Sequence, residues 1–302
     1  MELCFRKIYK CRIMKSICLF SSYFNQPSIP YYVRFYLEQI IPYFSETLFI
    51  TNEKELDEDS NYFLNVNNIS LLKVDNEGWD FGMWYKAIVQ LDTTQYHQVA
   101  LVNDSCILFK KPTQFFEWLK LSDADACGVT DSNAISYHLQ SYFLVFNQKA
   151  IPEMVNYFYE HKLLKHVSEV IETYEVGLSK HLLNKGLKLE ACYSTKEYHG
   201  EFSPTFFLIE NLLKKGIPMI KKKILFSSYR KSELFTLARM NFNINVDHYL
   251  SLIKKITYEP LIDFEKVKKD QEHGMHTWDC FVYNTKRNLI QTYRKLKGKH
   301  NE

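Results

Sequence analysis

Four short runs of apolar residues limit the folds open to this chain more than any other feature does. Each run lacks the alternation of polar and apolar residues seen in half-exposed strands, so each predicts a strand buried on both faces. Apolar residues with helical spacing lie between the runs, over residues 30–44 and again after residue 80. Strands that alternate with helices predict an α/β fold with a mostly parallel sheet flanked by helices. The runs are residues 16–20, 48–51, 69–74 and 99–102.

A cluster of polar residues follows each of these predicted strands. In parallel α/β sheets, ligands bind beyond the carboxyl ends of the strands, where such clusters meet. Their common position predicts a ligand site at that edge of the sheet. The clusters are residues 21–22, 52–53, 75–80 and 103–105.

The second half of the chain predicts more helices and two further strands, with no Pro/Ser/Gly linker between them. A helix is expected over residues 112–121, and strands are expected over residues 126–130 and 139–146. Three more helices are expected over residues 151–165, 175–186 and 203–216. We expect an N-terminal extension over residues 1–14, one catalytic domain over residues 15–230 and a helical C-terminal extension over residues 231–302.

Composition and charge exclude several classes of protein. A net charge of +3 and a pI near 8.3 are too small for a dedicated nucleic-acid binder, so no nucleic-acid partner is expected. No apolar run approaches the length of about 20 residues that spans a membrane. The apolar stretch after the basic N-terminus is too short for a secretion signal, so we expect a cytoplasmic protein. The 7 cysteines lack any CxxC pair and are expected to be reduced thiols.

The residues after the fourth strand are Asn103, Asp104 and Ser105. An Asp with oxygen-bearing neighbours at this position can hold Mg²⁺ or Mn²⁺, which would bridge to a substrate diphosphate. The alternative is that Asp104 caps the following loop. Asp123 and Asp125 form a literal Asp-x-Asp, but they precede a strand and are expected in a solvated loop at the opposite edge.

The turn after the third strand contains Asn76, Gly78 and Asp80. Gly78 permits a tight turn or a close approach of a ligand, and the polar side chains could bind ribose or a base. The alternative is a turn that caps the next helix. Ser21 and Asn52 follow neighbouring strands and are candidates for the same nucleoside site.

Two further groups of polar residues lie later in the chain. His138, Gln140 and Tyr142 alternate with other residues, so on one strand they would share a face and could line a pocket with Asp131. An exposed strand face is the alternative. Glu175 is expected at the start of a helix, where the helix dipole favours a carboxylate and where a simple cap is also possible.

Six ordered motifs together resemble the rhamnan synthesis protein F family of bacterial polysaccharide glycosyltransferases. The resemblance covers roughly residues 15–230. It implies a GT-A glycosyltransferase with a Rossmann-like sheet, a nucleotide-diphospho-sugar donor and a glycan or lipid-linked saccharide as acceptor. The motifs are residues 76–82 (NEGWDFG), 101–105 (LVNDS), 128–132 (GVTDS), 138–146 (HLQSYFLVF), 174–179 (YEVGLS), and 203–205 (SPT) with 216–221 (GIPMIK).

The resemblance also implies roles for residues of the site. Residues 103–105 lie where such enzymes carry a metal-binding Asp-x-Asp, although here Asp104 stands between Asn and Ser. Glu175 occupies the place of the general base that deprotonates the acceptor hydroxyl. Rhamnose is the sugar best known for the family. The predicted site comprises Glu175 and Asp104 as catalytic residues, Ser21, Asn52, Asn76, Gly78, Asp80, Asn103 and Ser105 around the donor, and Asp131, His138, Gln140 and Tyr142 around the sugar or acceptor.

Two questions about partners stay open at this point. A basic amphipathic helix predicted over residues 284–299 could lie on the inner face of the cell membrane or pack on its own domain. The chain could also be a non-catalytic subunit that binds a nucleotide sugar or a glycan within a polysaccharide synthesis complex.

Overall fold

A seven-stranded, mostly parallel sheet forms the centre of the protein in the computed structural model, which describes residues 15–161, 163–164, 167–197, 205 and 208–222. The strand order is β10-β6-β9-β4-β1-β2-β3, and only β9 runs antiparallel to its neighbours. This confirms the predicted α/β class. The strands are β1 (Lys15–Ser22), β2 (Glu46–Thr51), β3 (Ser70–Lys73), β4 (Tyr96–Asn103), β6 (Ala126–Gly128), β9 (Phe143–Asn147) and β10 (Leu189–Ala191).

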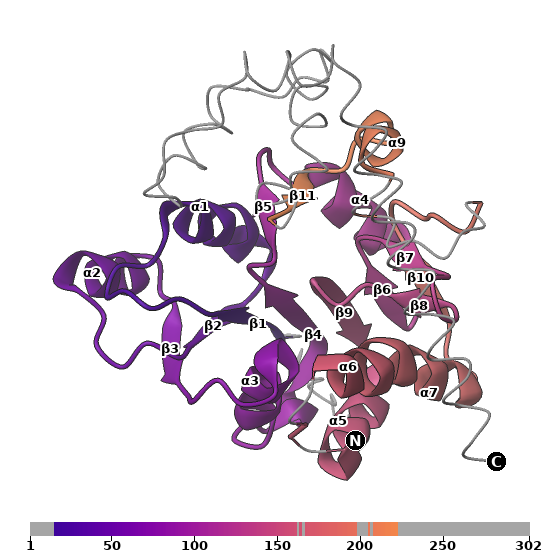
Figure 1. The fold of residues 1–302 in the computed structure, drawn as a ribbon, viewed down its shortest axis with the longest axis horizontal. Coiled ribbons are helices and arrows are strands. Elements are labelled where there is room, and N and C mark those ends of the chain that lie inside the picture. The colour runs from indigo at the N-terminus through magenta and orange to yellow at the C-terminus, as the bar shows by residue number, and fades with distance from the viewer. Residues whose placement is uncertain (1–14, 162, 165–166, 198–204, 206–207, 223–302) are drawn as a thin grey trace, which may run out of the picture.

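Helices cover both faces of this sheet (Figure 1). Successive residues of β1 point to opposite faces, so Cys18 and Phe20 join one core cluster while Ile17 and Leu19 join the other. Burial on both faces explains why the central strands are continuous apolar runs. One face carries α1 (Tyr31–Ile40), α2 (Glu58–Val66) and α4 (Thr113–Leu121), and the other carries α3 (Trp79–Ile88), α5 (Ala150–His161), α6 (Val167–Val170), η3 (Ile171–Gly177) and α7 (Leu178–Asn184).

Two small antiparallel pairs lie outside the main sheet. β5 (Cys106–Leu108) pairs with β11 (Met219–Lys221), and β7 (Asp131–Ser132) pairs with β8 (His138–Leu139). The remaining short elements are η1 (Ile41–Tyr43), η2 (Thr93–Gln95) and α9 (Ile209–Lys214).

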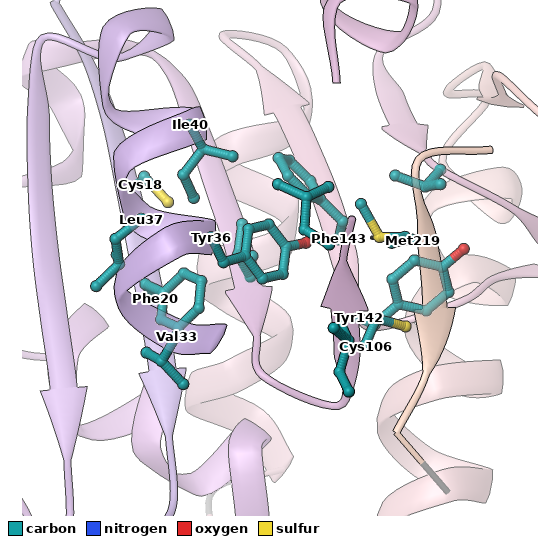
Figure 2. Packing of buried hydrophobic residues seen from close by; sticks show 14 of the residues in the cluster. Cys18, Phe20, Val33, Tyr36, Leu37, Ile40, Cys106, Tyr142, Phe143 and Met219 are labelled. Atoms are coloured by element: carbon teal, nitrogen blue, oxygen red, sulfur yellow. Dashed lines mark hydrogen bonds between the residues drawn. The ribbon is translucent and has the colours of Figure 1, made fainter. Parts of the chain in front are cut away.

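β11, which lies late in the chain, packs against α1, which lies in the first half of the chain. The Tyr36 hydroxyl donates a hydrogen bond of 3.6 Å to the sulfur of Met219, within the core cluster that also contains Phe143 (Figure 2). Backbone pairing places Lys221 opposite Cys106, directly after the end of β4. The end of the described chain is thereby held beside the carboxyl edge of the sheet.

The strand predicted over residues 139–146 is interrupted in the structure. β8 ends at Leu139 and β9 begins at Phe143, and residues 140–142 form a turn between them. The prediction of one strand was therefore wrong. The turn forms because Gln140 and Tyr142 both bond to the Thr130 hydroxyl, each at 2.7 Å, instead of continuing an alternating strand.

The helix predicted to begin at residue 175 begins earlier. α6, η3 and α7 follow one another without a break over residues 167–184, and η3 is a π-helix. Glu175 therefore lies inside a continuous helix, and the prediction that it opens a helix was wrong.

Several sequence predictions fall beyond what the structure describes. The first part of the helix expected over residues 203–216, the boundaries at residues 14 and 230, and the helix expected over residues 284–299 lie outside the described residues. The proposed domain division therefore stays a prediction. No helix in the described part of the chain is long and apolar enough to cross a membrane.

Candidate active site

The carboxyl ends of β1 and β4 bring the centre of the candidate site together. Ser21 and Asn103 lie opposite each other in the register of these neighbouring strands. Asn103 also orders the loop that follows, because its Oδ1 accepts a hydrogen bond of 3.0 Å from the backbone N–H of Ser105. The residues at the ends of β1 and β4 thus meet at the carboxyl edge of the sheet, where the sequence predicts a ligand site.

Asp80 joins this edge from the first turn of α3. Its Oδ2 accepts a 2.9 Å hydrogen bond from Asn103 Nδ2, and its Oδ1 lies 3.4 Å from the Ser21 hydroxyl that donates to it. Burial, and secondarily the negative charge of Asp104, raise the pKa of Asp80 to about 7. Asp80 can therefore act as acceptor or donor toward a ligand near neutral pH.

The turn before α3 is held in an unusual backbone conformation. Gly78 and Trp79 both have positive φ angles, 76° and 54°, and a left-handed conformation is uncommon for a Trp. The turn also folds closely over α3, because a Cβ on Gly82 would lie 1.7 Å from the carbonyl oxygen of Glu77. Trp79, which is 40% exposed, thus begins α3 directly before Asp80 in the chain.

Asp104 is a buried carboxylate with two partners on the same oxygen. The Tyr32 hydroxyl donates to Oδ2, and the Lys222 ammonium lies 2.9 Å from that atom. Lys222 Nζ also donates to the Tyr32 oxygen at 2.7 Å. Burial and the charge of Asp104 raise the pKa of Tyr32 well above its usual value, so this hydroxyl keeps its proton.

A second lysine, Lys221, ends β11 directly before Lys222. Lys221 Nζ donates to the Ser105 hydroxyl at 3.1 Å and lies 4.9 Å from the centre of the Tyr142 ring. The backbone N–H of Lys222 donates to the carbonyl oxygen of Ser105 at 2.8 Å. Pairing of β11 with β5 and this bond bring both ammonium groups to the loop after β4.

Glu175 is linked to the loop after β4 by the turn at residues 140–142. Its Oε1 lies 3.3 Å from both the backbone nitrogen and the hydroxyl oxygen of Ser141, which donate to it. Tyr142, the next residue, packs under Lys221, and its carbonyl oxygen accepts a hydrogen bond of 3.1 Å from the backbone N–H of Asn103. One turn thus connects Glu175 to the loop that carries Asp104.

A model of the rhamnan synthesis protein F family matches residues 47–274, which is well over half of the chain. The chain belongs to the rhamnan synthesis protein F family. This confirms the resemblance found in the ordered motifs.

Individual relatives of this family member are distant. The virulence protein VirA of Vibrio anguillarum is 25% identical in an alignment of 194 residues that covers 50% of this chain and 60% of VirA. The chain therefore spans less than two thirds of that relative's length.

Two solved structures of similar fold are named as transferases or synthases of sugar compounds. A putative nucleotide-diphospho-sugar transferase from Desulfovibrio desulfuricans has a TM-score of 0.39 and 12% identity, with 75% of this chain and 98% of that chain covered. The glucosyl-3-phosphoglycerate synthase of Mycobacterium tuberculosis, solved with Mn²⁺ and UDP, has a TM-score of 0.33 and 7% identity, with 46% and 59% covered.

Other residues predicted around the donor have different surroundings in this member of the rhamnan synthesis protein F family. Asn52 is engaged with the backbone of Phe24, accepting at 3.1 Å and donating at 2.9 Å, so it shapes the loop after β1. Asn76 is exposed in the turn before α3.

The residues predicted around the acceptor are mostly buried and bonded to the protein. Asp131 accepts hydrogen bonds from Ser194 and Thr195, and His138 Nδ1 lies 2.8 Å from the carbonyl oxygen of Ser136. Gln140 and Tyr142 are buried against Thr130. All four side chains are therefore engaged within the protein, and Ser141 is the residue of that turn whose bonds to Glu175 are described above.

The Asp-x-Asp at residues 123–125 lies at the opposite edge of the sheet, as expected, but the expectation of a solvated loop was wrong for Asp125, which is buried. Asp125 accepts a hydrogen bond from the backbone N–H of Lys188 at 3.0 Å, and Asp123 pairs with the Lys188 ammonium on the surface. Neither carboxylate reaches the site after β4.

Tyr32 and Lys222 were missed by the sequence analysis. Tyr32 looks like any residue in the first turn of α1, and Lys222 sits in a run of three lysines that could equally be a solvated patch. The available signal was the buried Asp104, because a buried carboxylate requires a cationic or hydrogen-bonding partner somewhere in the chain.

Proposed function

We propose that this chain is a glycosyltransferase that moves a sugar from a nucleotide-diphospho-sugar donor to a glycan or lipid-linked saccharide of a cell-surface polysaccharide. The observation that carries the proposal is the placement of two ammonium groups, Lys221 and Lys222, against the loop after β4. A diphosphate is the part of such a donor that needs cations, and the carboxyl edge of the sheet is where α/β folds bind ligands. Membership in the rhamnan synthesis protein F family supports the same activity.

The nucleoside is proposed to lie between the ends of β1 and β3. Asp80 and Ser21 present polar atoms there, and the raised pKa of Asp80 suits a hydrogen bond with a ribose hydroxyl. Trp79 offers an exposed aromatic face beside them, which is suited to stacking on a base.

The chemical step is proposed to be a direct displacement at the anomeric carbon. The acceptor hydroxyl oxygen forms the new bond, the bond from the anomeric carbon to the diphosphate breaks, and the nucleoside diphosphate leaves with the electron pair. Glu175 takes the proton of the acceptor hydroxyl. Both hydrogen bonds from Ser141 go to Oε1, so Oε2 is the oxygen that we propose receives this proton.

A resident Mg²⁺ or Mn²⁺ at Asp104, predicted from the sequence, does not fit the residues present. Asp104 Oδ2 already contacts a lysine and a tyrosine hydroxyl, and both oxygens of Asp80 have hydrogen-bond partners. Within the described residues, no group of three or more His, Cys, Asp or Glu side chains is placed to hold a metal ion. The mechanism above therefore uses no metal.

Three finer assignments belong to the same proposal. Rhamnose is the first sugar to test, because the family is named for rhamnan synthesis. The acceptor pocket is proposed to lie over the turn at residues 140–142, beside Glu175. The place of action is proposed to be the cytoplasmic face of the membrane, with residues 284–299 as the contact, which liposome flotation with and without residues 284–302 would test.

The experiment that tests the proposed function is a screen of nucleotide sugars against the full chain. A true donor binds the folded state and raises the melting temperature, and it should release its nucleoside diphosphate slowly even without acceptor. The panel should include dTDP-rhamnose, UDP-glucose, UDP-galactose and GDP-mannose. Binding without release or transfer would identify a non-catalytic subunit, and no binding of any nucleotide sugar would refute the proposal.

A further inference from the structure

We propose that the Lys222 ammonium, supported by Lys221, holds the donor diphosphate in the place that a divalent cation takes in a metal-dependent transferase, so that this protein binds its donor without a metal. The inference rests on the proposed function, because it names the group that binds the diphosphate of that donor. It assigns a role to Lys222 and Tyr32, which neither the motifs nor the family match singles out.

The first support is the position of the ammonium group. Lys222 Nζ lies 2.9 Å from Asp104 Oδ2, on the carboxylate where a bridging cation would be bound. A Mg²⁺ ion bonds to carboxylate oxygens at about 2.0–2.1 Å, so on this oxygen it would lie close to the ammonium group, which has the same sign of charge. The ammonium and a metal ion therefore compete for this side of the carboxylate.

The second support is the shortage of ligands for a metal. Asp104 and Asp80 are the carboxylates beside the loop after β4, and Asp80 is held through Ser21 and Asn103. A hard divalent cation needs six or so oxygen ligands, preferably charged ones. This part of the site supplies two aspartates, both already bonded within the protein, and no group of three or more metal-ligating side chains is present among the described residues.

The third support is that the lysines are positioned by the fold. The Lys222 N–H bonds to the Ser105 carbonyl oxygen at 2.8 Å, and Met219 is anchored on α1 by the Tyr36 hydroxyl (Figure 2). The Lys222 side chain is 25% exposed, while the Asp104 side chain is only 8% exposed. The ammonium group is thus bonded to the buried Asp104 and to Tyr32, while the lysine side chain stays partly exposed to solvent.

The hydrogen-bonding capacity of Lys222 leaves room for a phosphate. An ammonium group has three N–H donors, and two of them are directed at Asp104 and Tyr32. The third can bond to a phosphate oxygen, while Lys221, on Ser105, supplies a second positive charge. When the bond from the sugar to the diphosphate breaks, the electron pair stays on the phosphate oxygen, and these two charges stabilise it.

The test is calorimetric titration of the full chain with UDP, dTDP and GDP, each in excess EDTA and in excess MnCl₂ or MgCl₂. At least one of the three should bind in EDTA, with an affinity within about threefold of that in metal. Lys222→Met should weaken binding in EDTA by about 10-fold to 100-fold, since a hydrogen bond to a charged group is worth about 1.5–3 kcal/mol. Lys222→Arg keeps the positive charge, so it should weaken binding in EDTA less than Lys222→Met does.

Two further variants separate loss of the site from loss of the fold. Lys149→Met removes an exposed lysine at the opposite edge of the sheet and should leave binding unchanged. Because Lys222→Met leaves the buried Asp104 unpaired, the double variant Lys222→Met/Asp104→Asn removes that charge as well. The melting temperature of the double variant should be closer to that of the parent chain than the melting temperature of Lys222→Met is. The double variant should lose as much binding affinity in EDTA as Lys222→Met does.

The outcomes distinguish this inference from the proposed function. Binding that requires Mn²⁺ or Mg²⁺, with Lys222→Met as tight as the parent chain, would overturn the role of Lys222 and leave the transferase proposal standing. An unchanged affinity of Lys222→Met in EDTA would overturn it too. If none of the three diphosphates bound under either condition, both proposals would be refuted.

Discussion

The Lys222 ammonium lies 2.9 Å from the Asp104 carboxylate, although the two residues are 118 positions apart in the chain. Asp104 directly follows the central strand β4, and Lys222 directly follows the last described strand, β11. The ion pair therefore joins the centre of the sheet to the end of the described chain. A buried carboxylate at a ligand edge is stable only with such a partner, and the partner is itself suited to bind an anion.

Replacing Glu175 should slow transfer without unfolding the protein. If Glu175 is the general base, Glu175→Gln should lower kcat by about 100-fold or more, because the amide cannot take the proton of the acceptor. Binding of the nucleoside diphosphate should change little. Glu172→Gln, an exposed residue on the same π-helix, is the matched control and should keep the parent kcat. Near-normal transfer by Glu175→Gln would refute the assignment.

Asp80 should make stability depend on pH in a particular direction. Its pKa is raised from 3.8 to about 7, so between these values the folded protein holds a proton that the unfolded chain has released. The free energy of unfolding should therefore fall as the pH rises from about 4 to 7, and the whole penalty should be present above pH 7.

Asp80→Asn removes this ionisation, so it should restore the free energy of unfolding that the parent chain loses as the pH rises. At pH 8 the variant should melt about 2–4 °C above the parent chain, equivalent to about 1 kcal/mol after allowance for solvent screening. The difference should disappear toward pH 4, and calorimetric melting across this range would measure it. A difference that stays constant with pH would show that Asp80 has an ordinary pKa.

The close turn over α3 should tolerate no side chain at Gly82. Gly82→Ala would place a Cβ 1.7 Å from the Glu77 carbonyl oxygen, so the turn carrying Trp79 and Asp80 must move. We expect a loss of about 1–3 kcal/mol of stability in urea unfolding, together with weaker nucleotide binding. Gly186→Ala is the control, because no atom lies within 4 Å of its Cβ and only the positive φ of 76° costs stability. It should leave nucleotide binding intact.

Trp79 should contribute to binding of the nucleoside more than to folding. If its exposed face stacks on the base, Trp79→Ala should weaken nucleoside diphosphate binding by about twofold to tenfold, from a stacking energy of about 0.5–1.5 kcal/mol. Tyr62→Ala, which removes a 67% exposed aromatic residue from α2, should not change binding. Inorganic pyrophosphate, which has no base, should bind Trp79→Ala and the parent chain equally well, and a loss of pyrophosphate binding would contradict the stacking role.

The first half of the fold could be predicted because its signals are local. A buried strand such as β1 or β4 is a continuous apolar run, and α1 shows its buried face every three to four residues. Asp80, Asn103 and Ser21 could be placed at one edge because the polarity of parallel strands brings their carboxyl ends together.

The later elements were harder to predict because their form depends on partners elsewhere in the chain. Residues 138–146 alternate as a strand does, but Thr130 bonds to Gln140 and Tyr142 and turns the chain between β8 and β9. β5 and β11 have three residues each, too few for a periodic signal, and they exist as a pair.

The sequence by itself determined the α/β class, the family and the edge of the sheet that carries the site, because these follow from local patterns and ordered motifs. Only the tertiary structure decided which cation meets Asp104 and how Glu175 is held. The pairing of β5 with β11 carries Lys222 to Asp104, and the turn at residues 140–142 carries Ser141 to Glu175. These contacts join residues far apart in the chain, and their energy comes from burial and pairing that no local pattern records.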